Sequence, residues 1–243
     1  MKYVLIIGAK NGLGIELARL YARNKYNLYL AGRSITDIQD EANYLESTFG
    51  IKVTLCDLDV TDFSSHQKFY DNMVIKPIGV IYVAGYYPDP HKALGDWKES
   101  SNTINVNYAG AVSLLNIISK EFDHYQSGFI IGISSVSGLR GRAKNYIYGS
   151  SKAALITYLS GLRNKHDKSK VTVLTVISGY VKTKNSAKEQ SLRLLVINPK
   201  DLATKIYNAQ QNNKSIIYSS LIWKVVMFFI RILPESIFKK INI

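Results

Sequence analysis

The sequence contains a single cysteine, Cys56, among 243 residues. One thiol cannot form an intrachain disulfide and supplies too few ligands for a cysteine metal site, so we expect neither a disulfide scaffold nor a bound metal. The shortage is typical of a reducing compartment, which makes the cytoplasm the expected location. Cys56 itself lies in a strand-like segment and is interpreted as a small buried hydrophobic residue.

Long apolar runs are also absent. The uninterrupted apolar stretches within residues 221–234 are too short for a transmembrane helix, which needs about 20 apolar residues. The apolar run at residues 3–7 has one lysine before it and no small-residue cleavage site after it, so we interpret it as a strand and not as a signal peptide. No repeat, linker or low-complexity block divides the chain.

Acidic residues are few, with 18 Asp and Glu against 31 Lys and Arg, and the formal net charge is +13. Strongly basic proteins often bind nucleic acid or an anionic membrane. Here the basic residues are scattered and no nucleic-acid-binding motif is present, so we expect a solvated basic surface and no nucleic-acid partner. The charge also suits an anionic cofactor and anionic substrates, such as phosphorylated or lipid-phosphate-linked ketones.

What the sequence does contain is an alternation of apolar runs with helix-length amphipathic stretches, which is typical of parallel βαβ units. At 47% hydrophobic residues, the chain can bury a large core. We therefore expect an α/β fold: a single Rossmann-like doubly wound parallel sheet of about seven strands flanked by helices, plus an apolar C-terminal helix. The predicted strands lie near residues 2–8, 27–33, 52–58, 78–85, 128–134, 170–178 and 215–219.

A glycine-rich turn follows the first predicted strand. Gly8, Gly12 and Gly14 separate the strand from a helical pattern. Glycine permits positive φ angles and a close backbone approach to a ligand, and the N-terminus of the following helix offers free N–H groups to a phosphate. The segment therefore predicts a phosphate-binding loop.

Tyr148 and Lys152 lie four residues apart in a predicted helix, about thirteen residues after the Ser134–Ser135 pair that ends an apolar strand. This spacing puts a phenol and an ammonium group on one helical face, where the cation favours the phenolate. Tyrosine titrates near 10 and exchanges protons poorly at neutral pH, so we expect Lys152 to lower the pKa of Tyr148. A carbonyl–alcohol redox site needs this pairing.

Together these motifs resemble the short-chain dehydrogenase/reductase family, over residues 2 to about 219. The family patterns present are the glycine spacing, the Tyr148–Lys152 pair, Ser135 thirteen residues before the tyrosine, and Asn107 in Asn-Tyr-Ala-Gly. Two family segments depart from the pattern: serine replaces proline at Ser178–Gly179, and Tyr82–Gly85 keeps only the Ala-Gly half of Asn-Asn-Ala-Gly. The resemblance implies an NADP-binding Rossmann reductase domain with its own active site over residues 1–220, followed by an amphipathic tail helix over residues 221–243.

The resemblance also implies roles for individual residues. Tyr148 is the general acid or base, Ser135 binds the reacting oxygen, Lys152 holds the nicotinamide ribose, and Asn107 anchors a water that links Lys152 to solvent. Ser134 is the alternative to Ser135, although the thirteen-residue spacing favours Ser135. The expected cofactor-binding residues besides Tyr148 and Lys152 are Gly8, Lys10, Asn11, Gly12, Leu13, Gly14, Arg33, Ser34, Asp59, Val60, Ala84, Gly85, Gly179, Val181 and Thr183.

The second predicted strand ends in Gly32-Arg33-Ser34, without the acid that binds the ribose hydroxyl in enzymes that prefer NAD. Arg33 offers forked donors to a 2′-phosphate, and Ser34 adds a hydroxyl, so we expect NADP to be preferred. Lys10, in the glycine loop, lies one residue before the position where similar reductases often carry a second basic group. Asp59 resembles the family aspartate that contacts the adenine amine, and Asp57 competes for that assignment.

The expected function is reduction of a carbonyl by NADPH, or the reverse oxidation, on a substrate such as a keto-sugar or a lipid-linked ketone. The alternatives are a non-catalytic dinucleotide-binding sensor or scaffold and a sugar-nucleotide epimerase or dehydratase. Residues 184–197, with Leu192, Leu194 and Leu195, are expected to cover the pocket. We expect a homodimer or homotetramer.

The tail is the second informative segment. A stripe of Trp223, Val226, Phe229, Ile230, Leu233 and Ile237, with Lys224, Arg231, Lys239 and Lys240 beside it, predicts a contact with the core, with another subunit or with a membrane surface.

Overall fold

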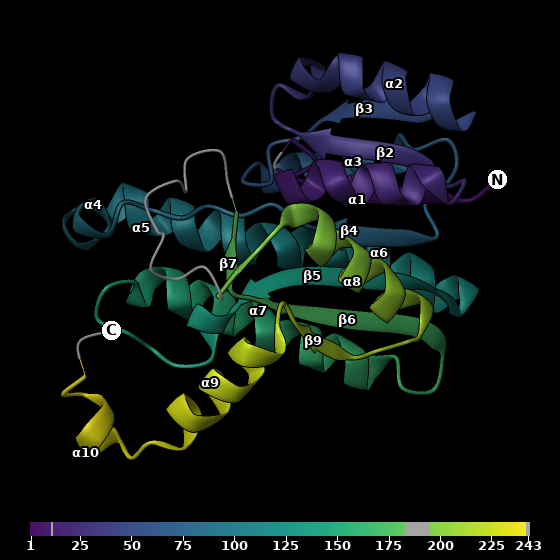
Figure 1. Cartoon of the computed structure of the whole chain (residues 1–243). Helices are drawn as coiled ribbons and strands as arrows, with labels where there is room; N and C mark the ends of the chain where they lie inside the picture. The colour runs from purple at the N-terminus through teal and green to yellow at the C-terminus, as the bar shows by residue number, and fades with distance from the viewer. Residues whose placement is uncertain (11, 183–194, 242–243) are drawn as a thin grey trace.

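The structure, a computed structural model, describes residues 1–10, 12–182 and 195–241. Seven parallel strands form one sheet in the order β3-β2-β1-β4-β5-β6-β9 (Figure 1). The strand order reverses direction between β1 and β4, which pair directly through Val4 to Ile7 and Gly79 to Tyr82. The strands are β1 Tyr3–Ile7, β2 Asn27–Gly32, β3 Val53–Asp57, β4 Gly79–Tyr82, β5 Ser127–Ser135, β6 Lys170–Ser178 and β9 Ile216–Tyr218.

Helices cover both faces of the sheet, so the central strands are buried on both sides. All five residues of β1 are buried, which explains why this strand is a continuous apolar run and does not alternate. The helices are α1 Gly12–Arg23, α2 Gln39–Phe49, α3 His66–Asp71, α4 Pro90–Gly95, α5 Trp97–Ile104, α6 Gly110–Tyr125, α7 Tyr146–Lys165, α8 Pro199–Gln211, α9 Leu221–Ile232 and α10 Glu235–Phe238.

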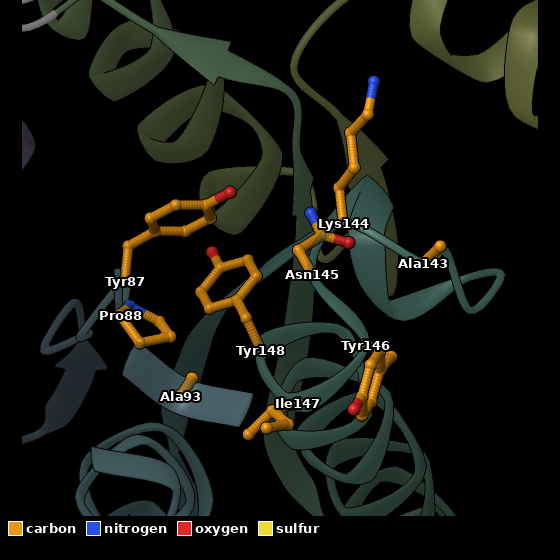
Figure 2. Close-up of a pocket in the computed structure, with 9 residues that line it drawn as sticks. All are labelled: Tyr87, Pro88, Ala93, Ala143, Lys144, Asn145, Tyr146, Ile147 and Tyr148. Atoms are coloured by element: carbon orange, nitrogen blue, oxygen red, sulfur yellow. The ribbon is translucent and has the colours of Figure 1, made fainter. Parts of the chain in front are cut away.

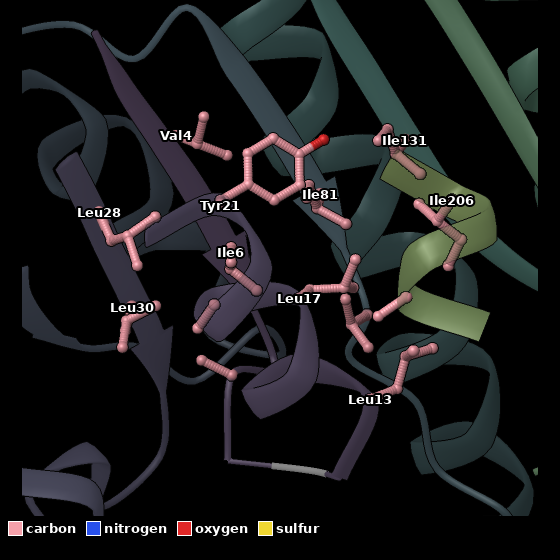
Figure 3. Packing of buried hydrophobic residues seen from close by; sticks show 14 of the residues in the cluster. Val4, Ile6, Leu13, Leu17, Tyr21, Leu28, Leu30, Ile81, Ile131 and Ile206 are labelled. Atoms are coloured by element: carbon pink, nitrogen blue, oxygen red, sulfur yellow. The ribbon is translucent and has the colours of Figure 1, made fainter. Parts of the chain in front are cut away.

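Two apolar layers result. On one face, Leu17 and Tyr21 of α1 and Ile206 of α8 pack on alternate residues of the strands, including Ile6 and Ile81 (Figure 3). On the other face, α3, α6 and α7 pack on the intervening strand residues through Tyr70, Leu114, Leu115, Ile118, Leu155 and Leu159. The expected doubly wound α/β fold with seven strands is confirmed.

Two local features were not predicted from the sequence. Residues Asn105–Ala109 form a π-helical turn between α5 and α6, a rare irregularity that is frequent at functional sites. A separate two-stranded pair joins β7 Tyr180–Val181 to β8 Val196–Ile197 just beyond the end of β6.

The C-terminal segment differs from the single tail helix expected over residues 221–243. Helix α9 ends at Ile232, and the short α10 begins after Pro234, because proline cannot continue the first helix. The predicted apolar stripe is divided: Trp223 is buried on the core, whereas Phe229 and Ile237 are 58% and 51% exposed. Within the described residues, no helix is both long and apolar enough to cross a membrane.

Candidate active site

The glycine loop lies between β1 and α1, at the carboxyl edge of the sheet. Gly8 has a φ of 92°, and a Cβ there would lie 2.5 Å from the Ala84 backbone nitrogen. A Cβ at Gly14 would lie 2.6 Å from the Gly8 carbonyl oxygen, so two of the three glycines are required by backbone crowding. A Cβ at Gly12 would lie 3.7 Å from the Pro199 side chain, an ordinary van der Waals contact, so crowding does not require glycine at this position. Asn11 lies outside the described residues.

A cavity of about 560 Å³ opens beside this loop and is bounded by the ends of β4, β5 and β6. Its walls include Ser135, Tyr148 and Lys152 of the predicted catalytic set and Leu13, Gly85, Gly179 and Val181 of the predicted cofactor set. The sheet therefore brings residues from six separate parts of the sequence to one cavity. Thr183, Leu192 and Leu194 lie outside the described residues, and Leu195 packs against the small cluster around Trp223.

Tyr148 lies in the first turn of α7, and its ring lies between Tyr87 and Asn145 in a small pocket that all three residues line (Figure 2). Burial raises the pKa of Tyr148 to about 12, while a hydrogen bond with Ser135 and the charge of Arg142 act in the opposite direction. The Tyr87 ring contacts the Tyr148 ring edge-on, with 4.8 Å between the two ring centres. A phenol and a serine hydroxyl are thus neighbours at the cavity wall.

Lys152 lies one turn further along α7 and is buried. Its Nζ donates to the Ile133 carbonyl at 3.1 Å and lies 5.9 Å from the centre of the Tyr148 ring. Burial lowers the pKa of Lys152 to about 8. The lowered pKa of Tyr148 expected from Lys152 is not found in this structure, because burial raises that pKa and the groups acting in the opposite direction are Ser135 and Arg142.

Asn107 lies in the π-helical turn and is fully buried. Its amide makes two hydrogen bonds of 2.8 Å to the backbone of Tyr86 and one of 3.2 Å to Ser151. A Cβ at Gly85 would lie 3.4 Å from Asn107 Oδ1 and 3.5 Å from Lys152 Nζ, so these three residues meet at one point. Asn107 therefore fixes the segment after β4 beside Lys152.

The two neighbouring serines at the end of β5 have different surroundings. Ser134 donates its hydroxyl to the Lys152 carbonyl at 2.9 Å and thereby ties β5 to α7. Ser135 accepts from the Ser137 backbone nitrogen at 3.1 Å and also interacts with Tyr148. This geometry favours Ser135 over Ser134 as the hydroxyl that faces a substrate oxygen.

The end of β2 forms a separate polar cluster beyond the walls of this cavity. Arg33 and Ser34 are exposed, and Ser34 has a left-handed backbone conformation with a φ of 47°. Lys10 donates to the Ser34 carbonyl at 3.0 Å and also pairs with Asp37. Asp37 was not predicted to lie in this cluster, because it follows the strand by five residues. A 3-10 turn at Ile35–Ile38 brings it back beside Lys10.

Asp59 and Asp57 can be told apart by position. Partial burial alone would raise the pKa of Asp59, but two hydrogen bonds from Thr61 and the charge of Arg33 lower it overall. Asp57 is an exposed residue of β3 that pairs in register with Gly32. Because the charge of Arg33 acts on Asp59, Asp59 is favoured over Asp57 as the acid beside a bound adenosine. Val60, the next predicted cofactor-binding residue, is buried.

Several residues of the cavity wall were not among the predicted site residues, and they include Tyr87, Arg142, Asn145 and Trp223. Tyr87, Arg142 and Asn145 lie on loops or at a helix end without a regular pattern, so no periodicity points to them. Among the described residues, no cluster of three or more His, Cys, Asp or Glu is suited to hold a metal ion.

Comparisons with known proteins agree with this geometry. A family model described as short chain dehydrogenase matches residues 2–193. An uncharacterized oxidoreductase of Mycobacterium tuberculosis is 27% identical over 240 residues, which cover 98% of this chain and 96% of the relative. A very-long-chain 3-oxoacyl-CoA reductase of Danio rerio is 25% identical over 188 residues, covering 75% of this chain and 59% of the relative.

Two solved structures share the fold across nearly the whole chain. A short-chain dehydrogenase from Sphingobium yanoikuyae in complex with NADPH has a TM-score of 0.83 and 20% identity, covering 97% of this chain and 98% of the other. A 7beta-hydroxysteroid dehydrogenase has a TM-score of 0.84 and 16% identity, and the match covers 98% of this chain and 95% of the other. The match to the family model over residues 2–193, on a sheet that gathers Ser135, Tyr148 and Lys152 at one cavity, means that the chain belongs to the short-chain dehydrogenase/reductase family of oxidoreductases, which act on carbonyl and alcohol groups.

Proposed function

We propose that this protein reduces a ketone or aldehyde to an alcohol with NADPH, or catalyses the reverse oxidation. The observation that carries the proposal is the meeting of Ser135, Tyr148 and Lys152 at one cavity next to the glycine loop. Each group alone is common in proteins. Together, at the point where the strand order reverses, they form the arrangement that a hydride-transfer site requires.

The residues at this edge fit a dinucleotide. The crowded glycines Gly8 and Gly14 hold the turn close to the ends of the strands, and the N-terminus of α1 at Gly12 would receive a pyrophosphate there. Leu13, Gly179 and Val181 line the cavity beyond it and would border the nicotinamide. A bound NADPH would supply the hydride for the reaction.

Tyr148 and Ser135 act on the same substrate oxygen in this proposal. As negative charge develops on the carbonyl oxygen, Tyr148 donates its phenolic proton to that oxygen while Ser135 donates a hydrogen bond. The pKa of about 12 keeps the phenol protonated at neutral pH, which suits an acid in the direction of reduction. In the reverse direction the phenolate would have to form first.

Lys152 and Asn107 support the proton transfer. The Lys152 ammonium group would bind the nicotinamide ribose and compensate the charge on Tyr148 after it has lost its proton. We further propose that a water at the π-helical turn of Asn107 connects Lys152 with solvent, so that the proton is replaced after each turnover. The contacts of Asn107 with Tyr86 and Ser151 would hold this turn in place.

The cofactor preference is proposed from the polar cluster at the end of β2. Arg33 and Lys10 provide two cations for a 2′-phosphate, and Ser34 provides a hydroxyl. Asp37 opposes this preference, because its carboxylate is paired with Lys10 and would have to release it to a phosphate. Two acids, Asp37 beside Lys10 and Asp59 near Arg33, face these two cations, so the preference for NADPH over NADH rests on the two cations and on the lack of an acid at residues 32–34.

Two other functions are less well supported. A dinucleotide-binding sensor would not require a phenol, a serine and a buried ammonium group around one cavity. An epimerase or dehydratase acting on sugar nucleotides would be expected to carry a different glycine spacing.

The test is a panel of ketones and aldehydes, supplied with NADPH or NADH and followed by the absorbance of the reduced nicotinamide. The proposal expects turnover of at least one carbonyl compound and a preference for NADPH. Tight NADPH binding without turnover across aliphatic, aromatic, steroid, sugar and acyl ketones would favour the sensor instead.

We also propose that the tail holds the protein at an anionic membrane surface. Leu221, Phe228, Phe229 and Ile232 are between 58% and 73% exposed on α9, and exposed apolar patches of this kind usually mark a contact. Lys224 and Arg231 lie on the same helix, where they suit anionic headgroups. A second copy of the chain is the alternative occupant of this face.

A further inference from the structure

A cation in the cavity is not used by the mechanism above. Arg142 lies in the loop between the 3-10 turn at Val136–Gly138 and α7, and it lines the same cavity as Ser135 and Tyr148. The side chain is partly buried. A guanidinium group stays charged at every accessible pH and is costly to remove from water without partners, so its position requires an explanation.

The protein contacts of Arg142 are neutral. Its Nη2 donates to the Ser137 hydroxyl at 2.5 Å. Among the ion pairs of the described residues, none includes Arg142, whereas Arg19, Arg140 and Lys165 each have a carboxylate partner. A guanidinium group carries five donors, so a single hydroxyl acceptor leaves most of its hydrogen-bonding capacity for a ligand.

Asn145 lies beside Arg142 and shares its partner. The Asn145 amide nitrogen donates to the same Ser137 hydroxyl at 3.3 Å, and its oxygen Oδ1 is buried without a hydrogen-bond partner. Figure 2 shows the Asn145 amide on one side of the Tyr148 ring and Tyr87 on the other. Buried amide oxygens are nearly always hydrogen-bonded, so this one is suited to accept from a ligand hydroxyl or amide.

These groups lie close to the atoms that react. Ser137 follows Ser135 by two residues and lines the cavity with it. Arg142 lines the same cavity as Tyr148, and its charge also acts on the phenol. A substrate whose carbonyl oxygen meets Ser135 and Tyr148 would therefore present its neighbouring atoms to Arg142.

We propose that Arg142, together with Ser137 and Asn145, recognises an anionic oxygen group, a carboxylate or a phosphate, that the substrate carries near the carbonyl to be reduced. The inference rests on the proposed reductase function and adds a substrate class to it. Arg142 supplies the charge, Ser137 holds the guanidinium group in place, and Asn145 accepts from a hydroxyl or amide of the same substrate.

The test compares matched pairs of carbonyl compounds that differ in one charge. One pair is a keto acid and its methyl ester, and the other is a phosphorylated hydroxyketone and the parent hydroxyketone. Charge-assisted hydrogen bonds predict that kcat/KM favours the anionic member of at least one pair by roughly ten- to hundredfold. Which pair shows the preference distinguishes a carboxylate from a phosphate.

Three variants assign the preference to Arg142. Arg142→Gln should reduce the ratio within the preferred pair to near one, and Arg142→Lys should keep part of it, because the charge remains but the fork is lost. Lys144→Gln is the matched control: it removes one positive charge from the same loop, but this side chain points away from Tyr148 (Figure 2). A purely structural role of Arg142 would change both members of a pair equally and leave the ratio unchanged.

A binding measurement separates this inference from the reductase function. Titration of the enzyme with benzoate, phenyl phosphate and neutral benzamide, in the presence of NADPH, needs no turnover. Tighter binding of one anion than of benzamide, lost in Arg142→Gln but kept in Lys144→Gln, supports the inference even if no carbonyl is reduced. Equal kcat/KM within both pairs, or equal binding of all three compounds by the parent and Arg142→Gln proteins, would overturn it while leaving the reductase function intact.

Discussion

The Trp223 indole of α9 packs directly on the Gly179 backbone at the end of β6. A Cβ at residue 179 would lie only 1.9 Å from Trp223 Nε1, so no other residue type fits there without movement of the tryptophan. The same Nε1 donates a hydrogen bond to the Leu195 carbonyl at 2.8 Å. The indole also contacts the Tyr180 ring edge-on, with 5.7 Å between the ring centres. Because Gly179, Tyr180 and Trp223 all line the large cavity, the tail is part of the wall of the candidate active site.

This contact predicts the effect of Gly179→Ala. The added methyl group would displace Trp223 and part of α9, and overpacking of this kind costs about 1–3 kcal/mol of the free energy of unfolding. Urea unfolding followed by tryptophan fluorescence measures the change. Gly141→Ala is the control, because a Cβ there meets nothing within 4 Å. Equal stability of the two variants would mean that α9 is not held against β6.

Removal of the Tyr148 hydroxyl should separate binding from chemistry. Tyr148→Phe keeps the ring and loses only the transferable proton, so we expect unchanged NADPH affinity and a loss of turnover of roughly 10²- to 10⁴-fold. Tyr146→Phe is the matched control, since Tyr146 is half exposed and points away from Tyr148 (Figure 2). Substantial activity in Tyr148→Phe on a good substrate would show that another group is the acid.

The pH profile of reduction should report Lys152. Its ammonium form is the one proposed to act, and burial lowers its pKa to about 8, so the active form is present below that pH and is lost above it. Tyr148, with a pKa of about 12, stays protonated throughout this range. We therefore expect log kcat/KM to fall by about one per pH unit above pH 8. A flat profile up to pH 10 would contradict the assignment.

Arg33 should set the cofactor preference. Loss of its charge-assisted contacts in Arg33→Ala should reduce NADPH affinity by about ten- to hundredfold and leave NADH affinity nearly unchanged. Fluorescence titration with both cofactors measures the two constants. Arg23→Ala, at the far end of α1, is the control for a loss of charge elsewhere. Equal effects on NADPH and NADH would remove Arg33 from the phosphate site.

The strands could be predicted from the sequence because buried parallel strands appear as continuous apolar runs. The run Tyr3–Ile7 and the six later ones all form strands whose ends lie within three residues of the predicted bounds. The positions of the motifs likewise predicted that Ser135, Tyr148 and Lys152 meet, because the carboxyl ends of parallel strands lie at one edge of the sheet. The three residues do line the same cavity.

Other features depend on contacts that sequence spacing does not contain. The spacing of Tyr148 and Lys152 indicates a shared helical face, but the balance between burial and charge decides the pKa values, and here burial dominates for both residues. Asp37 is close to Lys10 only because a 3-10 turn folds it back. Arg142 and Asn145 lie on an irregular loop, so only the structure connects them with the cavity.

The tail illustrates the same limit. Helix α9 is apolar on more than one side, and periodicity alone cannot tell which side docks on the core. The docked side is fixed by the space that Gly179 leaves for Trp223, and Met227 is buried one turn later. The opposite side, with Phe228 and Ile232, is the one left exposed.

That exposed side leads to the last prediction, on membrane attachment. The parent protein should sediment with vesicles that contain anionic lipid, and sedimentation should weaken as salt screens Lys224 and Arg231. The double variant Phe228→Ser and Phe229→Ser should lose most of this binding without unfolding, because both rings are about 60% exposed. Phe63→Ser, at a 43% exposed position outside the tail, should retain it.

The oligomeric state distinguishes the two occupants of this side of α9. If a second copy of the chain covers it, light scattering should show a dimer that the double variant disrupts, and neither protein should bind vesicles at low salt. Because exposed aromatic rings of this size are unfavourable in water, a stable monomer without vesicle binding would contradict the membrane proposal and the dimer alternative together.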